Sequence, residues 1–136
     1  MKMRIGGGRI IDGVSAEPVE DSLLVIRDGK IAFVGARGSP DAQKFEADES
    51  LDATGMTVMP GLVDPHSHLC MSAGENCIRD FWRDTDNLHG GDDILLLRTA
   101  QNVQRCLAGG VTAIADCGST GLVTQTVRDC VNSGLV

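Results

Sequence analysis

The sequence predicts a protein of the α/β class, with a first part made of short strands and a second part in which strands and helices alternate. In residues 1–57, short apolar runs are separated by glycine-containing turns. In residues 58–136 the order is strand, loop, helix, strand, helix, and this pattern is typical of a parallel sheet with right-handed crossovers. The 136 residues suffice for roughly one domain of ordinary size.

The strands of the first part are predicted from the turns between them. Residues 9–11 are a β-branched run, and the runs 22–27 and 30–35 flank Asp28-Gly29. A D-G pair between two apolar runs is a strong hairpin signal. Apolar residues fill nearly every position of the second run, which favours a strand covered on both faces. Residues 44–52 are predicted to form a polar strand that would suit a sheet edge, and we expect residues 1–57 to form a largely antiparallel sheet.

The second part begins with a nearly continuous apolar run, residues 56–63, interrupted by Pro60-Gly61. Proline cannot donate a ladder hydrogen bond, so we place the core-forming strand just after it and expect that strand to be buried on both faces. Residues 69–91 show no clear period and are predicted to form a long loop, which in compact domains is often functional.

Two helices and a strand complete the second part. Asp92 and Asp93 can cap a helix that ends at Gly109-Gly110. Its predicted apolar stripe consists of Leu96, Ala100, Val103 and Leu107. Residues 111–115 are predicted to be a short buried strand. Residues 121–133 are predicted to be a second helix, with Leu122, Val123, Val127, Cys130 and Val131 facing inward and Gly134 as its stop.

Composition and charge exclude several classes of protein. Hydrophobic residues make up 42% and charged residues 23%, which excludes a chain disordered throughout. The formal net charge is −7 and neither part is basic, so the electrostatic signature of a nucleic-acid or anionic-membrane binder is missing. The first residues lack the long apolar run of a signal peptide, and the sequence has no apolar stretch of the length of a membrane span. Five cysteines without C-x-x-C spacing favour a reduced, cytoplasmic protein.

The stretch most informative about chemistry is Asp64-Pro65-His66-Ser67-His68, at the end of the apolar strand. Strand side chains alternate, so Asp64, His66 and His68 should point to one side. Two adjacent imidazoles can both bind one zinc ion through neutral nitrogens, and a strand end is a rigid mount. Asp64 lies earlier in the strand, too far from the two histidines to be assigned as a ligand, and could orient one of the imidazoles by a hydrogen bond. The alternative is that both histidines are merely polar residues where a strand meets solvent.

Four further features are weaker candidates. Cys70 could supply a third ligand after His66 and His68, but it is more simply a small residue at the start of the loop. Asp116 ends the second apolar strand and is interpreted as structural or as part of the site rim. His89 is interpreted as an ordinary surface residue. Charged residues of the loop could meet a substrate or could simply be solvated: Glu75, Arg79, Asp80 and Arg83.

The segment VMPGLVDPHSHL (residues 58–69) resembles the first barrel strand of the amidohydrolase superfamily, whose members are metal-dependent hydrolases related to imidazolonepropionases, dihydroorotases, hydantoinases, prolidase-like peptidases and aminohydrolases. The resemblance covers nearly the whole chain. It extends to GRIIDG (8–13), DGKIAFVG (28–35), DATG (52–55) and LAGGVTAIAD (107–116).

This resemblance implies a TIM-type (β/α)₈ barrel flanked by a small β-sandwich, with the active site at the carboxyl ends of the barrel strands. Residues 1–57 would be a portion of the composite sandwich. Residues 58–136 would be the first two β/α units of a truncated barrel. His66 and His68 would bind one or two Zn²⁺ ions, and metal-activated water would attack an amide, cyclic amide or peptide-like bond of a small molecule.

The other functional groups of the family, a lysine, two more histidines and a catalytic aspartate, come from later strands and have no counterpart here. We therefore expect the general base to lie beyond this chain, and the chain alone to be inactive. Two alternatives remain open. One is an aminohydrolase (deaminase) of the same superfamily, and the other is a non-catalytic metal-binding module that forms homo-oligomers through exposed strand edges.

Overall fold

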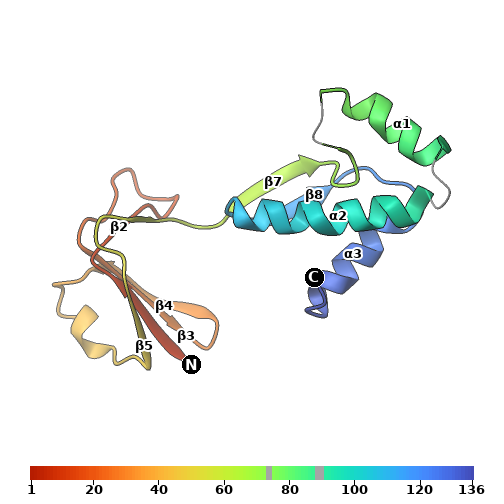
Figure 1. The fold of residues 1–136 in the computed structure, drawn as a ribbon. Coiled ribbons are helices and arrows are strands. Elements are labelled where there is room, and N and C mark those ends of the chain that lie inside the picture. The colour runs from red at the N-terminus through yellow and green to blue at the C-terminus, as the bar shows by residue number, and fades with distance from the viewer. Residues whose placement is uncertain (73–74, 88–90) are drawn as a thin grey trace. The chain divides into compact units, whose positions relative to one another are not determined.

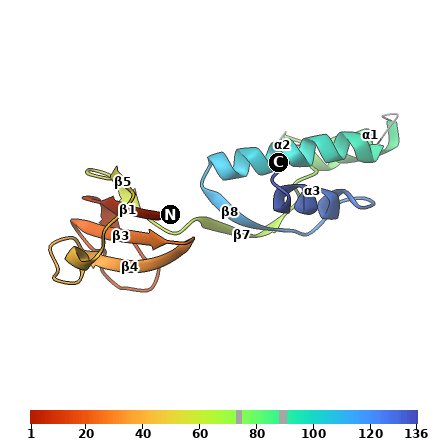
Figure 2. The same cartoon turned by 90° about the horizontal axis from the view of Figure 1, so that it is seen from below.

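The computed structural model describes residues 1–72, 75–87 and 91–136 and divides the chain into two compact units, Met1–Pro60 and Gly61–Val136 (Figure 1, Figure 2). The first unit consists mainly of strands, and the second contains strands and helices. The predicted α/β class is therefore confirmed.

The first unit contains a four-stranded sheet and a separate two-stranded pair. The sheet has the order β4-β3-β1-β5, and its strands are β1 (Lys2–Gly6), β3 (Ser22–Arg27), β4 (Lys30–Ala36) and β5 (Glu49–Asp52). The pair consists of β2 (Arg9–Ile10) and β6 (Thr57–Val58). A short 3₁₀ helix, η1 (Ala42–Lys44), precedes β5.

The predicted hairpin is present. β3 and β4 pair in antiparallel fashion, with Arg27 opposite Lys30. Asp28 and Gly29 both have positive φ, 51° and 74°, as a two-residue type I′ turn requires. The core of the unit lies beneath this hairpin and consists of Leu23, Val25 and Ala42, with Phe33 and Phe45 packed against it.

Three expectations for the first unit were wrong. β5 pairs with β1, and β6 with β2, in parallel, so only half of the strand pairs are antiparallel. The reason is that the chain, after forming the hairpin β3–β4, comes back to β1 and β2 running in the same direction as those strands. β4 is an edge strand whose faces are not both covered, and Ile31 is 67% exposed, because few side chains of the unit pack onto this end of the sheet. In the run 44–52, only Glu49–Asp52 is a strand, although it does lie at an edge.

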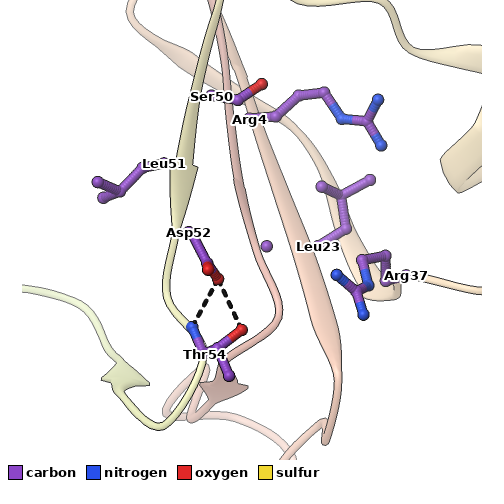
Figure 3. A pocket seen from close by; sticks show the side chains of 8 residues that line it. Arg4, Leu23, Arg37, Ser50, Leu51, Asp52 and Thr54 are labelled. Carbon is purple, nitrogen blue, oxygen red and sulfur yellow. Dashed lines mark hydrogen bonds between the residues drawn. The ribbon is translucent and has the colours of Figure 1, made fainter.

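A side chain fixes the turn that follows β5. The Asp52 carboxylate accepts hydrogen bonds from the Thr54 amide (2.9 Å) and the Thr54 hydroxyl (2.6 Å), as Figure 3 shows. These bonds, the hydroxyl first, lower the pKa of Asp52. Both residues line a shallow hollow of about 360 Å³, together with Arg4, Gly6, Leu23, Arg37, Ser50 and Leu51.

The second unit contains a two-stranded parallel sheet and three helices. These elements are β7 (Leu62–Ser67), α1 (Cys77–Asn87), α2 (Gly91–Ala108), β8 (Val111–Asp116) and α3 (Val123–Asn132). β7 and β8 pair in parallel, as predicted, with Leu62 opposite Val111 and Ser67 opposite Asp116. Helix α2 connects them and packs against β8, α1 and α3 (Figure 1).

The C-terminal ends of α2 and α3 follow their predicted glycine signals, whereas Asp92 and Asp93, which were expected to cap α2, lie within its first turn. Gly110, just after α2, has φ 88°, and its amide donates to the Leu107 carbonyl. Gly134 has φ 73° and donates to Val131, while Leu135 donates to Cys130, so that α3 ends in a Schellman motif. The residues predicted to form the buried faces of these two helices agree less well with the structure. Leu95 and Thr99 are the buried residues of α2. Leu107 is 60%, Leu122 71% and Val131 42% exposed, although all three were expected to face inward.

Two further expectations for the second unit were wrong. β7 and β8 are largely exposed, with Leu62 49% and Val63 68% accessible, because within the described chain few side chains pack onto the faces of this two-stranded sheet. The expected loop 69–91 contains the helix α1. A cap signal was present in the sequence: the Asn76 side chain accepts a hydrogen bond from the Arg79 amide at 3.3 Å.

Candidate metal centre

His66 and His68 lie side by side at the carboxyl end of β7. His66 is the next-to-last residue of the strand, and His68 follows the strand directly. Their ring centroids are 5.2 Å apart and the ring planes are inclined by 77°. Both side chains are exposed. The strand therefore presents two accessible imidazoles at one point.

Asp64 holds the backbone of β7 at His66, the first of the two histidines. Its carboxylate accepts a hydrogen bond from the backbone amide of His66 at 3.0 Å. The sequence suggested that this carboxylate could orient an imidazole. The structure places it on the main chain that carries the imidazole instead.

Asp116 connects three segments at the carboxyl end of β8. Its Oδ1 accepts hydrogen bonds from the Leu69 amide (3.3 Å) and the Gly118 amide (3.5 Å), and its Oδ2 accepts one from the Thr124 hydroxyl (2.9 Å). These contacts tie the turn after β7 to the turn after β8 and to the start of α3. Such a network supports a structural role beside the site.

The turn that follows His68 is also held by α2. The side-chain amide of Asn102 donates to the carbonyls of Leu69 (2.8 Å) and Met71 (3.1 Å). The sequence interpretation missed Asn102. A signal was available, because Leu95, Thr99 and Asn102 follow the i, i+4, i+7 spacing of one helix face, and an asparagine on a largely buried face needs partners.

Cys70 is completely buried and packs in a cluster with Leu95 and Val123. Its thiol donates to the Gly118 carbonyl at 3.1 Å. Burial, followed by the negative charge of Asp116, raises the pKa of Cys70. In the part of the chain that the structure describes, no three His, Cys, Asp or Glu side chains are grouped so that they could hold a metal. The arrangement of Cys70 as a third ligand is therefore not found.

Similarity to known proteins decides the family. No family model matches the chain. It is 35% identical, over 68% of its length, to a 5-methylthioadenosine/S-adenosylhomocysteine deaminase of Desulforudis audaxviator. It is 30% identical, over 84% of its length, to an imidazolonepropionase of Thermoanaerobacter pseudethanolicus. A solved Xaa-Pro dipeptidase matches all of the chain with a TM-score of 0.75 and 26% identity. The chain belongs to the amidohydrolase superfamily.

This amidohydrolase chain spans only part of its relatives. It covers 23% of the deaminase, 31% of the imidazolonepropionase and 31% of the dipeptidase structure.

The chemistry of the two histidines suits a zinc ion, but only in part. Neutral imidazole nitrogens are common zinc ligands, and both rings are accessible at a strand end. A catalytic zinc site takes three protein ligands and keeps an open position. Among the described residues of this amidohydrolase chain, His66 and His68 are candidates for two of those ligands.

The remaining candidates have ordinary partners or lie elsewhere. Asp80 accepts a hydrogen bond from the Ser72 hydroxyl at 3.1 Å and pairs with Arg83 at 3.3 Å. Glu75 and Arg79 are exposed. His89 lies outside the described residues. Within residues 1–72, 75–87 and 91–136, none of the helices has the length and apolar character needed to cross a bilayer.

Cys70 and Cys117 are expected to differ sharply in thiol reactivity. Cys117 is exposed, whereas Cys70 is buried with a raised pKa, so little of its reactive thiolate forms near neutral pH. Alkylation of the native protein at about pH 8, followed by peptide mass spectrometry, should label Cys117 rapidly and Cys70 only after unfolding. Equal labelling rates in the native protein would show that the Cys70 cluster is open.

Proposed function

We propose that this chain is the amino-terminal part of a metal-dependent amidohydrolase that cleaves C–N bonds in small molecules by hydrolysis. The observation that carries the proposal is the pair of imidazoles, 5.2 Å apart, at the carboxyl end of a strand in a parallel sheet. Barrel enzymes place their active sites at this end of their strands. The preferred substrate class is an amide, a cyclic amide or a peptide-like bond.

Residues 1–57 would contribute to a composite β-sandwich, and residues 58–136 would form the first two units of a (β/α)₈ barrel. The parallel pair β7–β8, with a helix after each strand, supports this architecture. The exposed apolar residues of β7 support it as well, because further barrel strands would cover them.

His66 and His68 would hold one or two Zn²⁺ ions in this protein. When bound, the metal activates a water molecule and polarises the bond to be broken. Asp64 holds the backbone of His66, and Asp116 holds the turn that follows His68, so both carboxylates support the ligands from the rim. The general base and the remaining ligands would come from chain segments outside these residues. We also place the protein in the cytoplasm, where its five free thiols would stay reduced.

A second candidate is an aminohydrolase of the same superfamily, which would release ammonia from an amino-substituted ring. The observation that favours it is the 35% identity to a protein named as a deaminase. Both candidates use the same histidine pair and differ only in the substrate.

The test is a substrate panel with the full-length protein loaded with zinc. Amides, lactams and dipeptides report on amide hydrolysis, and amino-substituted purines report on deamination. We expect turnover of one of these classes, abolished by a chelator and restored by zinc. Failure to turn over any class, with the metal bound, would contradict the proposal.

The 136-residue chain alone is expected to show no turnover in the same panel. Hydrolysis at a metal needs a third ligand and a general base beside the water, and the described residues provide two ligands. Zinc-dependent turnover by a monomer of this chain, measured with its oligomeric state by light scattering, would show that its catalytic groups have been misassigned.

A further inference from the structure

Gly118, in the turn after β8, lies directly against the imidazole of His68. A Cβ atom added to Gly118 would be 2.5 Å from Nδ1 and 2.9 Å from Cε1 of that ring. The backbone of Gly118 is not in the left-handed region, so conformation does not require glycine here. Glycine is required instead because the His68 ring occupies the space that a side chain at position 118 would need.

The main chain of Gly118 makes one hydrogen bond through its carbonyl and one through its amide. The buried thiol of Cys70 donates to its carbonyl at 3.1 Å, and its amide donates to Asp116 at 3.5 Å. Cys70 is two residues after His68. The Asp116 oxygen that accepts the hydrogen bond from Gly118 also accepts one from the backbone amide of Leu69. Hydrogen bonds therefore join the turn after β7, which carries His68, to the turn after β8, which lies against the His68 ring.

We infer that Gly118 is a positioning residue for the metal centre: its backbone, fixed by Cys70 and Asp116, forms the wall that sets the orientation of the His68 imidazole. This inference rests on the proposed role of His68 as a metal ligand. An exposed histidine at a strand end could otherwise adopt several rotamers, and a ligand that must first be ordered binds more weakly. Groups that orient metal-binding histidines typically change metal affinity about 10–100-fold when mutated.

Gly118→Ala separates positioning from folding. The atoms that the new methyl group would meet belong to an exposed side chain that can rotate away, so the apoprotein should fold normally. The imidazole, however, would be displaced from its orientation toward the metal. Gly109→Ala is the matched control in the same unit, because its nearest neighbours are at an ordinary 3.4 Å and its backbone is also outside the left-handed region.

The experiment measures zinc affinity of the full-length protein by competition with a chromophoric chelator, together with thermal unfolding of the apoprotein. The visible spectrum of the Co²⁺ form reports ligand geometry. Gly118→Ala should lower zinc affinity about 10–100-fold and change the Co²⁺ spectrum. Its apoprotein should unfold at the same temperature as Gly109→Ala, which should bind zinc like the unaltered protein. A purely structural glycine would give the opposite result, with altered unfolding and unchanged metal binding.

His68→Ala, measured in parallel, distinguishes the two ways of failing. If His68→Ala loses zinc but Gly118→Ala does not, the inference is overturned and the proposed metal centre stands. If neither variant changes zinc binding, the proposed centre fails and the inference with it. Should Gly118→Ala not fold, Cys70→Ala and Cys70→Ser decide. Weaker zinc binding in the alanine variant, recovered when serine restores a donor to the Gly118 carbonyl, supports the inference, and equal binding in both overturns it.

Discussion

Replacing either His66 or His68 by alanine is expected to remove bound zinc and activity together from the full-length protein. If the proposed zinc centre is correct, each substitution would delete one ligand nitrogen from a centre to which the described chain would contribute two histidines. The loss of zinc affinity should exceed the about 10–100-fold change typical of residues that only orient a ligand. Because both side chains are exposed, neither substitution should unfold the protein.

His89→Ala is the control for this prediction, since it removes the third histidine of the sequence, which the sequence predicts to be an ordinary surface residue. Zinc per protein would be measured by plasma mass spectrometry, turnover with the substrate found in the panel, and folding by circular dichroism. Unchanged zinc content in both His66→Ala and His68→Ala would rule out these residues as ligands.

The sequence predicts local structure best where the signal lies within a few residues. Asp28-Gly29 identifies the hairpin because two adjacent positive φ angles are needed there and few residue pairs supply them. Gly134 marks the end of α3 for a similar reason. The strands that flank α2 were also found, because each is a short apolar run next to a clear turn.

Burial was predicted less well because it depends on neighbours that a local pattern does not name. The apolar run of β7 is typical of a strand covered on both faces, yet Val63 is 68% exposed in the described chain. The parallel pairing of β1 with β5 joins segments more than 40 residues apart, and no turn signal records such a pairing. Tertiary context decides both features.

The same limit applies to the site. The spacing of His66 and His68 made them visible as a pair, because both lie in one strand end. The groups that hold their surroundings come from distant segments: Asn102 is 33 residues from the Leu69 carbonyl it contacts, and Gly118 is 48 residues from Cys70. A sequence pattern shows which residues could bind a metal, whereas the supporting contacts become visible only when the turns after β7 and β8 are seen together.

Leu95→Ala is expected to destabilise the second unit by about 2–5 kcal/mol, the range for removing a buried leucine side chain from a core. Leu95 is completely buried in α2, where it packs in a cluster with Cys70 and Val123. Leu97→Ala is the matched control. It makes the same chemical change on the same helix at a side chain that is 68% exposed, so its effect should stay within about 0.5 kcal/mol.

Urea unfolding of the 136-residue chain, followed by tryptophan fluorescence, measures this difference. Trp82 is the only tryptophan in the sequence and lies in α1, which packs on α2, so its signal reports on the second unit. Equal shifts of the unfolding midpoint in both variants would show that Leu95 is not part of a packed core. Because Cys70 belongs to the Leu95 cluster and donates to the Gly118 carbonyl, a cavity at position 95 should also loosen the wall against His68. In the full-length protein, folded Leu95→Ala should therefore bind zinc more weakly than folded Leu97→Ala.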